Sequence, residues 1–165
     1  MGADGRIVAW QLGRPPREPW RVCVRCDFGY PQVIASPSRL DDGTPFPTLF
    51  YLTCPYLVAE ASALEAAGAS KQWAERLRAD ESLARAMRVA DTAYREARAS
   101  ESGGVDACAD VGIAGQRDPL GTKCLHAHTA AALAGINDPV GRDVVASAGA
   151  RCNDARCSEG EQSCG

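Results

Sequence analysis

The residue pair Cys54-Pro55 marks an abrupt change in the pattern of the chain, and this change limits the folds that the sequence can form. Before it, short apolar runs alternate with turn residues, whereas after it apolar residues recur at helical spacing. The first part is expected to contain strands at Arg6–Leu12, Arg21–Cys26, Gln32–Ala35 and Thr48–Leu52. All three Phe and three of the four Tyr lie between positions 28 and 56, so the aromatic core should be built around the last three of these strands.

Helices are expected over most of the remaining chain. Thr53 can cap a helix that has Pro55 in its first turn and ends at Gly68. Periodicity and end signals predict further helices at Ser70–Ala79, Glu81–Arg98, Lys123–Ala134 and Val140–Ala148. The sequence therefore predicts an α+β fold, in which a small antiparallel sheet in the N-terminal third packs against a set of α-helices. Residues 1–148 are expected to form a single domain, and residues 149–165 a flexible, cysteine-containing tail.

Charge and composition narrow the class of protein. The first 20 residues are interrupted by Gly, Pro and Arg before an apolar run develops, so we expect no signal peptide, no membrane span and a cytoplasmic location. In a reducing compartment, the eight cysteines should be metal ligands, catalytic thiols or small buried side chains rather than a disulfide framework. The net charge of −3 disfavours nucleic acid or an anionic membrane as the main partner, which leaves a small molecule or another protein.

The densest group of reactive side chains lies in residues 123–128. These six residues hold both histidines of the chain, one cysteine and one of its only two lysines. Cys124 is expected in the first turn of a helix, where free amide groups and the helix dipole favour a thiolate over a thiol. Lys123 would add a positive charge beside it. A thiolate both coordinates metals and attacks electrophiles, so the same position suits either a metal ligand or a nucleophile.

Two further cysteines are expected at one edge of the sheet. If the strands run up, down and up, the first and third end at the same edge, and their ends are Cys26 and Cys54. Neighbouring strands lie about 4.8 Å apart, so the two thiols should be within roughly 5 to 10 Å of each other. Cys26 also forms a CxxC pair with Cys23, but residues three apart on a strand point to opposite faces. We therefore expect Cys26, without Cys23, to join Cys54 and Cys124 in one site.

Either histidine can complete this site. On a regular helix, Cys124 and His128 are four residues apart and share a face, whereas Cys124 and His126 point about 200° apart. His126 can therefore be a ligand together with Cys124 only if the helix begins after Cys124. The sequence leaves both histidines as candidates.

Several phrases of the chain are similar to a known family. They are Leu12-Gly13-Arg14-Pro15-Pro16, Arg25-Cys26 with Gly29-Tyr30-Pro31, Asp42-Gly43-Thr44-Pro45-Phe46-Pro47-Thr48 leading to Leu52-Thr53-Cys54-Pro55, Lys123-Cys124-Leu125-His126, and Asp138-Pro139-Val140-Gly141. Together they resemble the bacterial domain of unknown function 501 family over about residues 10–145. The resemblance implies shared positions for Cys26, Cys54, Cys124 and His126 and no particular substrate. Cys23 and the cysteines of the tail are not part of the pattern.

Three functions remain open at this point. The first is a metal-binding protein of unknown reaction in which Cys26, Cys54, Cys124 and His126 or His128 hold zinc or an iron–sulfur cluster. The second is a metal-free thiol enzyme with Cys124 as nucleophile, Lys123 lowering its pKa and a histidine as base. The third is a small interaction domain whose cysteines are simply buried. The sequence assigns no role to Cys23, Cys108, Cys152, Cys157 or Cys164.

Overall fold

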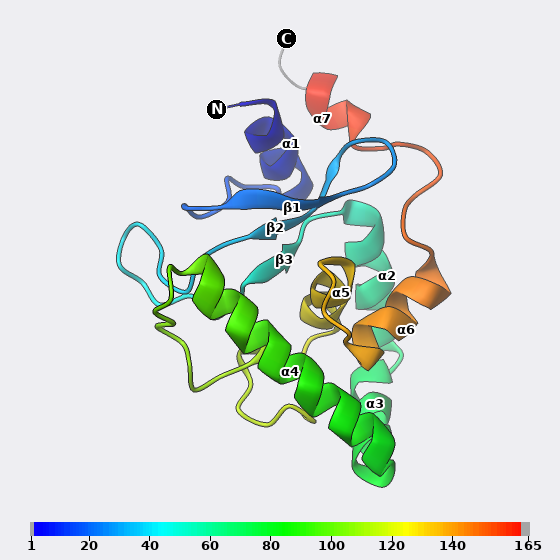
Figure 1. Ribbon diagram of the computed structural model, residues 1–165. Coiled ribbons are helices and arrows are strands. Elements are labelled where there is room, and N and C mark those ends of the chain that lie inside the picture. Colours follow the sequence, from blue (N-terminus) through cyan, green and yellow to red (C-terminus); the bar gives the residue numbers. More distant parts are fainter. Residues whose placement is uncertain (1, 163–165) are drawn as a thin grey trace.

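A three-stranded antiparallel sheet forms in the N-terminal third, as the sequence predicts (Figure 1). The computed structural model describes residues 2–162. The strands are β1 (Arg21–Arg25), β2 (Pro31–Ala35) and β3 (Phe50–Leu52), with β2 in the centre. With the helices that follow it, this sheet confirms the expected α+β class.

The alternation of side chains along the strands gives the sheet two different faces. Val33 and Ala35 of β2 are buried in the main core together with Phe50 and Leu52 of β3. Ile34, between them, lines a groove on the other face of the sheet. The larger set of helices therefore packs on only one face.

The helices account for most of the remaining chain. They are α1 (Ala3–Leu12), α2 (Pro55–Ala66), α3 (Ala69–Ala79), α4 (Glu81–Glu101), the short 3₁₀ turn η1 (Ile113–Gly115), α5 (Leu125–Leu133), α6 (Pro139–Ala148) and α7 (Ser158–Gln162). Within residues 2–162, no helix combines the length and the apolar character that crossing a bilayer requires.

The strand expected at Arg6–Leu12 is wrong, because this segment belongs to helix α1. Ile7 and Val8 favour strands by propensity, but both are buried by tertiary packing of the helix, which overrides such weak preferences. Gly13 ends the helix in the left-handed conformation, with φ of 70°. The burial of Ile7 and Val8 on a helix thus depends on tertiary packing, which the short sequence pattern does not reveal.

Helix α5 lies at the centre of the molecule, between β3, α2 and α6 (Figure 1). Six of its nine residues are buried, and three of those six are alanines that let neighbouring elements approach closely. The approach of α6 is closest at Gly141, where an added Cβ would lie 1.9 Å from the backbone oxygen of His128. The position of α5 therefore depends on a glycine in the next helix.

Arg98 of α4 fixes the long loops around this core. Its side chain is fully buried and its Nε donates to both carboxylate oxygens of Asp106, at 2.9 and 3.1 Å. Its Nη groups donate to the backbone oxygens of Pro47, Cys108 and Val111. A buried guanidinium is tolerated only when its donors are paired. These bonds therefore hold the loop that contains Pro47 and the loop that contains Cys108 and Val111 against α4.

The last residues that the structure describes return to the N-terminal helix. Cys152 and Cys157 are buried, and α7 packs against α1 at the far side of the sheet from α5 (Figure 1). Gly160 makes this contact close, since an added Cβ would lie 3.1 Å from the Trp10 ring. Cys164 lies outside the described residues, and the division into a domain and a flexible tail stays a prediction.

We expect Gly141→Ala to destabilise the protein, because the new methyl group would overlap the α5 backbone at His128. Backbone atoms cannot rotate away, so the net cost should be about 2 kcal/mol or more despite the better helix propensity of alanine. The measurement is the urea midpoint, with Gly2→Ala as control because nothing lies within 4 Å of that position. Equal midpoints for the two variants would contradict the close approach.

Candidate metal centre

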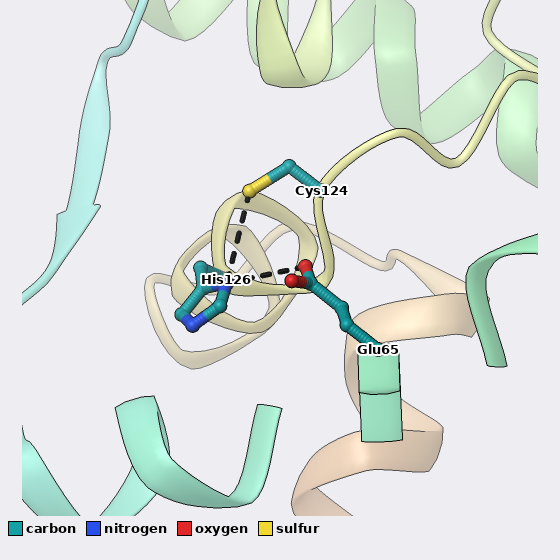
Figure 2. A group of neighbouring side chains, drawn as sticks. All are labelled: Glu65, Cys124 and His126. Carbon is teal, nitrogen blue, oxygen red and sulfur yellow. Dashed lines mark hydrogen bonds and ion pairs between the residues drawn. The ribbon is translucent and has the colours of Figure 1, made fainter. Parts of the chain in front are cut away.

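Three side chains of different chemistry meet beside the N-terminus of α5. One ligand atom each from Glu65, Cys124 and His126 lies within 4.8 Å of the other two (Figure 2). Glu65 comes from α2, and the other two come from the start of α5. Among residues 2–162 this is the one group of three such side chains at that spacing.

The local backbone explains why Cys124 meets His126. Cys124 is the N-cap of α5 and has extended geometry, with φ of −138° and ψ of 106°. The helix therefore begins at Leu125, after the cysteine, which is the condition under which His126 can point to the same place. Glu65 fixes the arrangement from α2, because its Oε1 accepts the free amide hydrogen of Leu125 at 2.8 Å.

His126 presents one ring nitrogen to both of its partners (Figure 2). Its Nδ1 lies 3.9 Å from the Cys124 sulfur and 3.2 Å from Glu65 Oε1. Its Nε2 lies 3.0 Å from the hydroxyl of Ser62, one turn before Glu65 on α2. The imidazole is thus oriented by Ser62 with Nδ1 turned toward the sulfur and the carboxylate.

The two central groups favour each other's charged forms. Burial acts to raise the pKa of Cys124, but hydrogen bonds from His126 and from the Ala127 amide outweigh it, so this pKa is lowered. The hydrogen bond with Cys124 raises the pKa of His126, and the charge of Glu65 adds to this effect while burial opposes it. The helix N-terminus therefore stabilises the thiolate as the sequence suggests, through the Ala127 amide.

A cavity of about 500 Å³ opens beside this group. Cys124, His126 and Ala127 form one part of its wall. The other lining residues come mainly from β3 and α1, and they are Gln11, Leu12, Thr48, Phe50, Tyr51, Leu52, Thr53, Val58 and Ala114. The site is partly exposed, with side-chain accessibilities of 27% for His126 and 30% for Glu65, so a small molecule can reach it.

The other candidates near Cys124 lie in different surroundings. His128 is buried, and its Nδ1 lies 2.6 Å from Asp138 Oδ2 between α5 and α6. Lys123 is exposed, and within the described chain its ammonium group makes no hydrogen bond or ion pair. The structure therefore groups Cys124 with His126 and places His128 and Lys123 apart from them. Their roles as ligand or catalytic residues stay predictions.

Within residues 2–162, the group of three ligand atoms that includes Cys124 contains neither Cys26 nor Cys54. Cys54 is the N-cap of α2, whereas Glu65 lies eleven residues later, near the end of the same helix. At 1.5 Å per residue, this separates the two positions by about 16 Å. Cys26 follows β1 in the turn before β2, so the expected edge that brings it near Cys54 does form. The cysteines predicted for one site are thus divided between two places.

Sequence reasoning missed Glu65 and Ser62. Both lie on helix α2, whose Glu side chains are easily taken as solvent-facing. The one available signal is their spacing of three residues, which places a hydroxyl and a carboxylate on one helix face. Only the packing of α2 against α5 shows what that face meets.

Comparison with known proteins places the chain in a family. A family model described as a protein of unknown function, DUF501, matches residues 22–146. The chain belongs to the DUF501 family. The segment that matches the DUF501 model contains Glu65, Cys124 and His126, and it ends before Cys152 and Cys157. No curated protein and no solved structure matches the chain.

We expect Cys124 to be alkylated by iodoacetamide at a lower pH than four other cysteines whose pKa is raised by burial, namely Cys23, Cys54, Cys108 and Cys157. Only the thiolate reacts, and its fraction below the pKa changes about tenfold per unit of pKa. His126→Gln should move the Cys124 profile to higher pH and leave the other four unchanged. Peptide mass spectrometry of chelator-treated protein measures the alkylation of each cysteine as a function of pH. An unchanged Cys124 profile in His126→Gln would contradict the hydrogen bond between Cys124 and His126.

Proposed function

We propose that this DUF501 protein is a metal-binding protein whose Glu65, Cys124 and His126 hold one zinc ion, with a coordination position open to the adjacent cavity. The observation that carries the proposal is the convergence of a sulfur, a nitrogen and an oxygen donor within 4.8 Å of one another. Zinc accepts all three donor types in proteins. The reaction itself is left open.

The spacing of the donors supports a tetrahedral ion. With zinc bonds of 2.0 to 2.3 Å, tetrahedral geometry requires about 3.6 Å between sulfur and nitrogen and about 3.4 Å between nitrogen and oxygen. The corresponding separations here are 3.9 Å and 3.2 Å. Small side-chain rotations therefore suffice for all three to bind a single ion.

Further contacts support the role of His126 as a ligand. A histidine that binds a metal through one nitrogen commonly uses the other nitrogen in a hydrogen bond that fixes the ring. Ser62 provides this partner at Nε2, so Nδ1 is the nitrogen left for the ion. The same arrangement argues against an iron–sulfur cluster here, because clusters require several thiolates and this group has one.

The cavity supports a site that acts on a small molecule. Catalytic zinc sites have three protein ligands and keep a fourth position for water or substrate, whereas structural sites are closed by four. Cys124 and His126 line the cavity wall, so an ion held by them would border a space bounded largely by apolar side chains. A bound zinc ion would supply an activated water or polarise a carbonyl group of the ligand.

The lowered pKa of Cys124 favours a second candidate, a thiol enzyme with Cys124 as nucleophile. In such enzymes the base uses one ring nitrogen for the nucleophile and the other for the carboxylate that orients it. Here both the thiol and Glu65 meet Nδ1 of His126, and Nε2 is turned to Ser62. Because the thiol and the carboxylate meet the same nitrogen, this geometry suits three ligands of one metal ion better than a histidine that takes a proton from the thiol while the carboxylate orients its other nitrogen.

We expect Cys124→Ser, His126→Gln and Glu65→Gln each to weaken zinc binding at this site by about 100-fold or more, because substitution of outer-shell partners alone often costs 10- to 100-fold. The measurement is competition with a chromophoric chelator, together with the zinc content of the purified chain. Cys23→Ser is the matched control, since Cys23 is a half-buried cysteine on β1, away from this group.

Two results would count against the zinc site. One is equal zinc affinity in Cys124→Ser and Cys23→Ser. The other is a metal-free wild-type protein in which Cys124 alone reacts with electrophiles, and that result would favour the thiol enzyme instead.

A further inference from the structure

Four cysteines outside the Glu65–Cys124–His126 group gather around the tail of the chain. Cys26 follows β1, Cys54 caps α2, and Cys152 and Cys157 lie between α6 and α7. All four are free thiols, and three of them are buried, with exposures of 5% for Cys54, 7% for Cys152 and 5% for Cys157. The function proposed above uses none of them.

The tail is held against the turn that contains Cys26. Arg151 pairs with Asp27, the residue after Cys26, at 3.1 Å, and Glu161 accepts a hydrogen bond from the Tyr30 hydroxyl at 3.2 Å. Tyr30 closes the same turn, because its backbone oxygen accepts the Cys26 amide at 2.9 Å. The tail thus contacts the Cys26 turn through one residue before Cys152 and one residue after Cys157.

A glutamine of β2 connects the tail to Cys54. The side chain of Gln32 donates to the backbone oxygen of Ala150 at 2.6 Å, and its own backbone oxygen accepts the Cys54 amide at 3.3 Å. The Tyr56 hydroxyl also donates to the backbone oxygen of Ala148, where α6 ends. These bonds bring the start of the tail to the N-terminus of α2.

One of the sulfurs, that of Cys157, receives a hydrogen bond of the kind that stabilises a thiolate. Gln11 Nε2 lies 3.2 Å from the Cys157 sulfur and 2.7 Å from the backbone oxygen of Pro31. N–H···S bonds of this type support metal-bound sulfur.

The four thiols are close enough to act on one another. Burial raises the pKa of Cys54 most, and the charges of Cys152 and Cys26 raise it further. The pKa of Cys157 is likewise raised by burial and by the charges of Cys54, Cys152 and Cys26.

The tail lacks the apolar surface that usually orders a segment of this length. Between Gly149 and Gln162 its apolar side chains are only alanine and cysteine. Each ordered residue loses backbone entropy, and exposed ion pairs such as Arg151–Asp27 compensate for little of it. A metal that links two tail cysteines to two core cysteines would supply the missing stabilisation.

We infer that Cys26, Cys54, Cys152 and Cys157 form a second metal site, a four-thiolate centre for a thiophilic metal, separate from the group at α5. Its ligands come from the strand end, the start of α2 and a C-x₄-C pair in the tail. With four protein ligands this site is closed, so its task is to fasten the tail to the domain or to hold an electron-transfer cluster.

The lack of a compact group of three of these sulfurs within residues 2–162 fits a [4Fe–4S] cluster better than a single zinc ion. Zinc with four thiolates requires sulfurs about 3.8 Å apart. Within residues 2–162 no three of these cysteines come within 4.8 Å of one another. A cluster holds its thiolates further apart, because each binds a different iron.

The test uses the full chain purified without oxygen, as Cys124→Ser to remove the first site, with and without Cys152→Ser/Cys157→Ser. Iron, sulfide and zinc per chain are measured with the visible spectrum. Cys23→Ser/Cys108→Ser in the same background is the matched control, since it also removes two cysteines. We expect bound metal in the Cys124→Ser protein and in the control, and at least a tenfold lower content after loss of Cys152 and Cys157.

X-ray absorption on the Cys124→Ser protein tests the same site without depending on how the tail variant folds. A coordination shell of sulfur alone, around iron or zinc, supports the four-thiolate centre. A brown protein with sulfide identifies the cluster, and a colourless one with zinc shows that the sulfurs close around one ion. Metal content unchanged by loss of Cys152 and Cys157, a disulfide among the four cysteines, or a Cys124→Ser protein without metal would overturn the inference, whatever the outcome for zinc at Cys124.

Discussion

The buried carboxylate of Asp138 holds together the part of the molecule on which the candidate site depends. Its Oδ1 accepts the amide hydrogens of Val140 and Gly141 and so caps α6, while its Oδ2 lies 2.6 Å from His128 Nδ1 on α5. Both side chains are almost fully buried, which makes this pair expensive to break. The contact between His128 and Asp138 fixes α5 against α6. The Cys124–His126 segment at the start of α5 therefore has a rigid support, as a preformed site requires.

This pair also explains why the two histidines have different surroundings. A carboxylate accepts hydrogen bonds, so His128 presents the hydrogen of its Nδ1 to Asp138, and within the described chain its Nε2 has no partner. His126, two residues earlier, points away from the core toward Glu65, Ser62 and the cavity. About half a turn of helix thus separates a histidine that positions the helix from one that can bind a ligand.

The sequence contains much of the fold and a smaller part of the site. Strand alternation and helix periodicity gave the sheet and the helices from α2 to α6, because those patterns reflect local geometry. The two-residue spacing of Cys124 and His126 also indicated that these side chains can meet only if the helix begins after Cys124, and α5 does begin at Leu125. Glu65 and the α1 helix were missed, since the first depends on contact between distant helices and the second on burial that overrides propensity.

Helix α2 is the element that separates the Glu65–Cys124–His126 group from Cys54 and the tail cysteines. Cys54 caps its start, beside the tail, and Glu65 lies near its end, beside Cys124. A helix is stiff over this length, so the backbone positions of Cys54 and Glu65 stay about 16 Å apart along it. The sequence predicted Cys26, Cys54 and Cys124 in one site, because thiols at strand and helix ends look alike along the chain. The packing distinguishes them, because Cys124 meets one imidazole and one carboxylate, whereas Cys54 is buried in the main core at the start of α2.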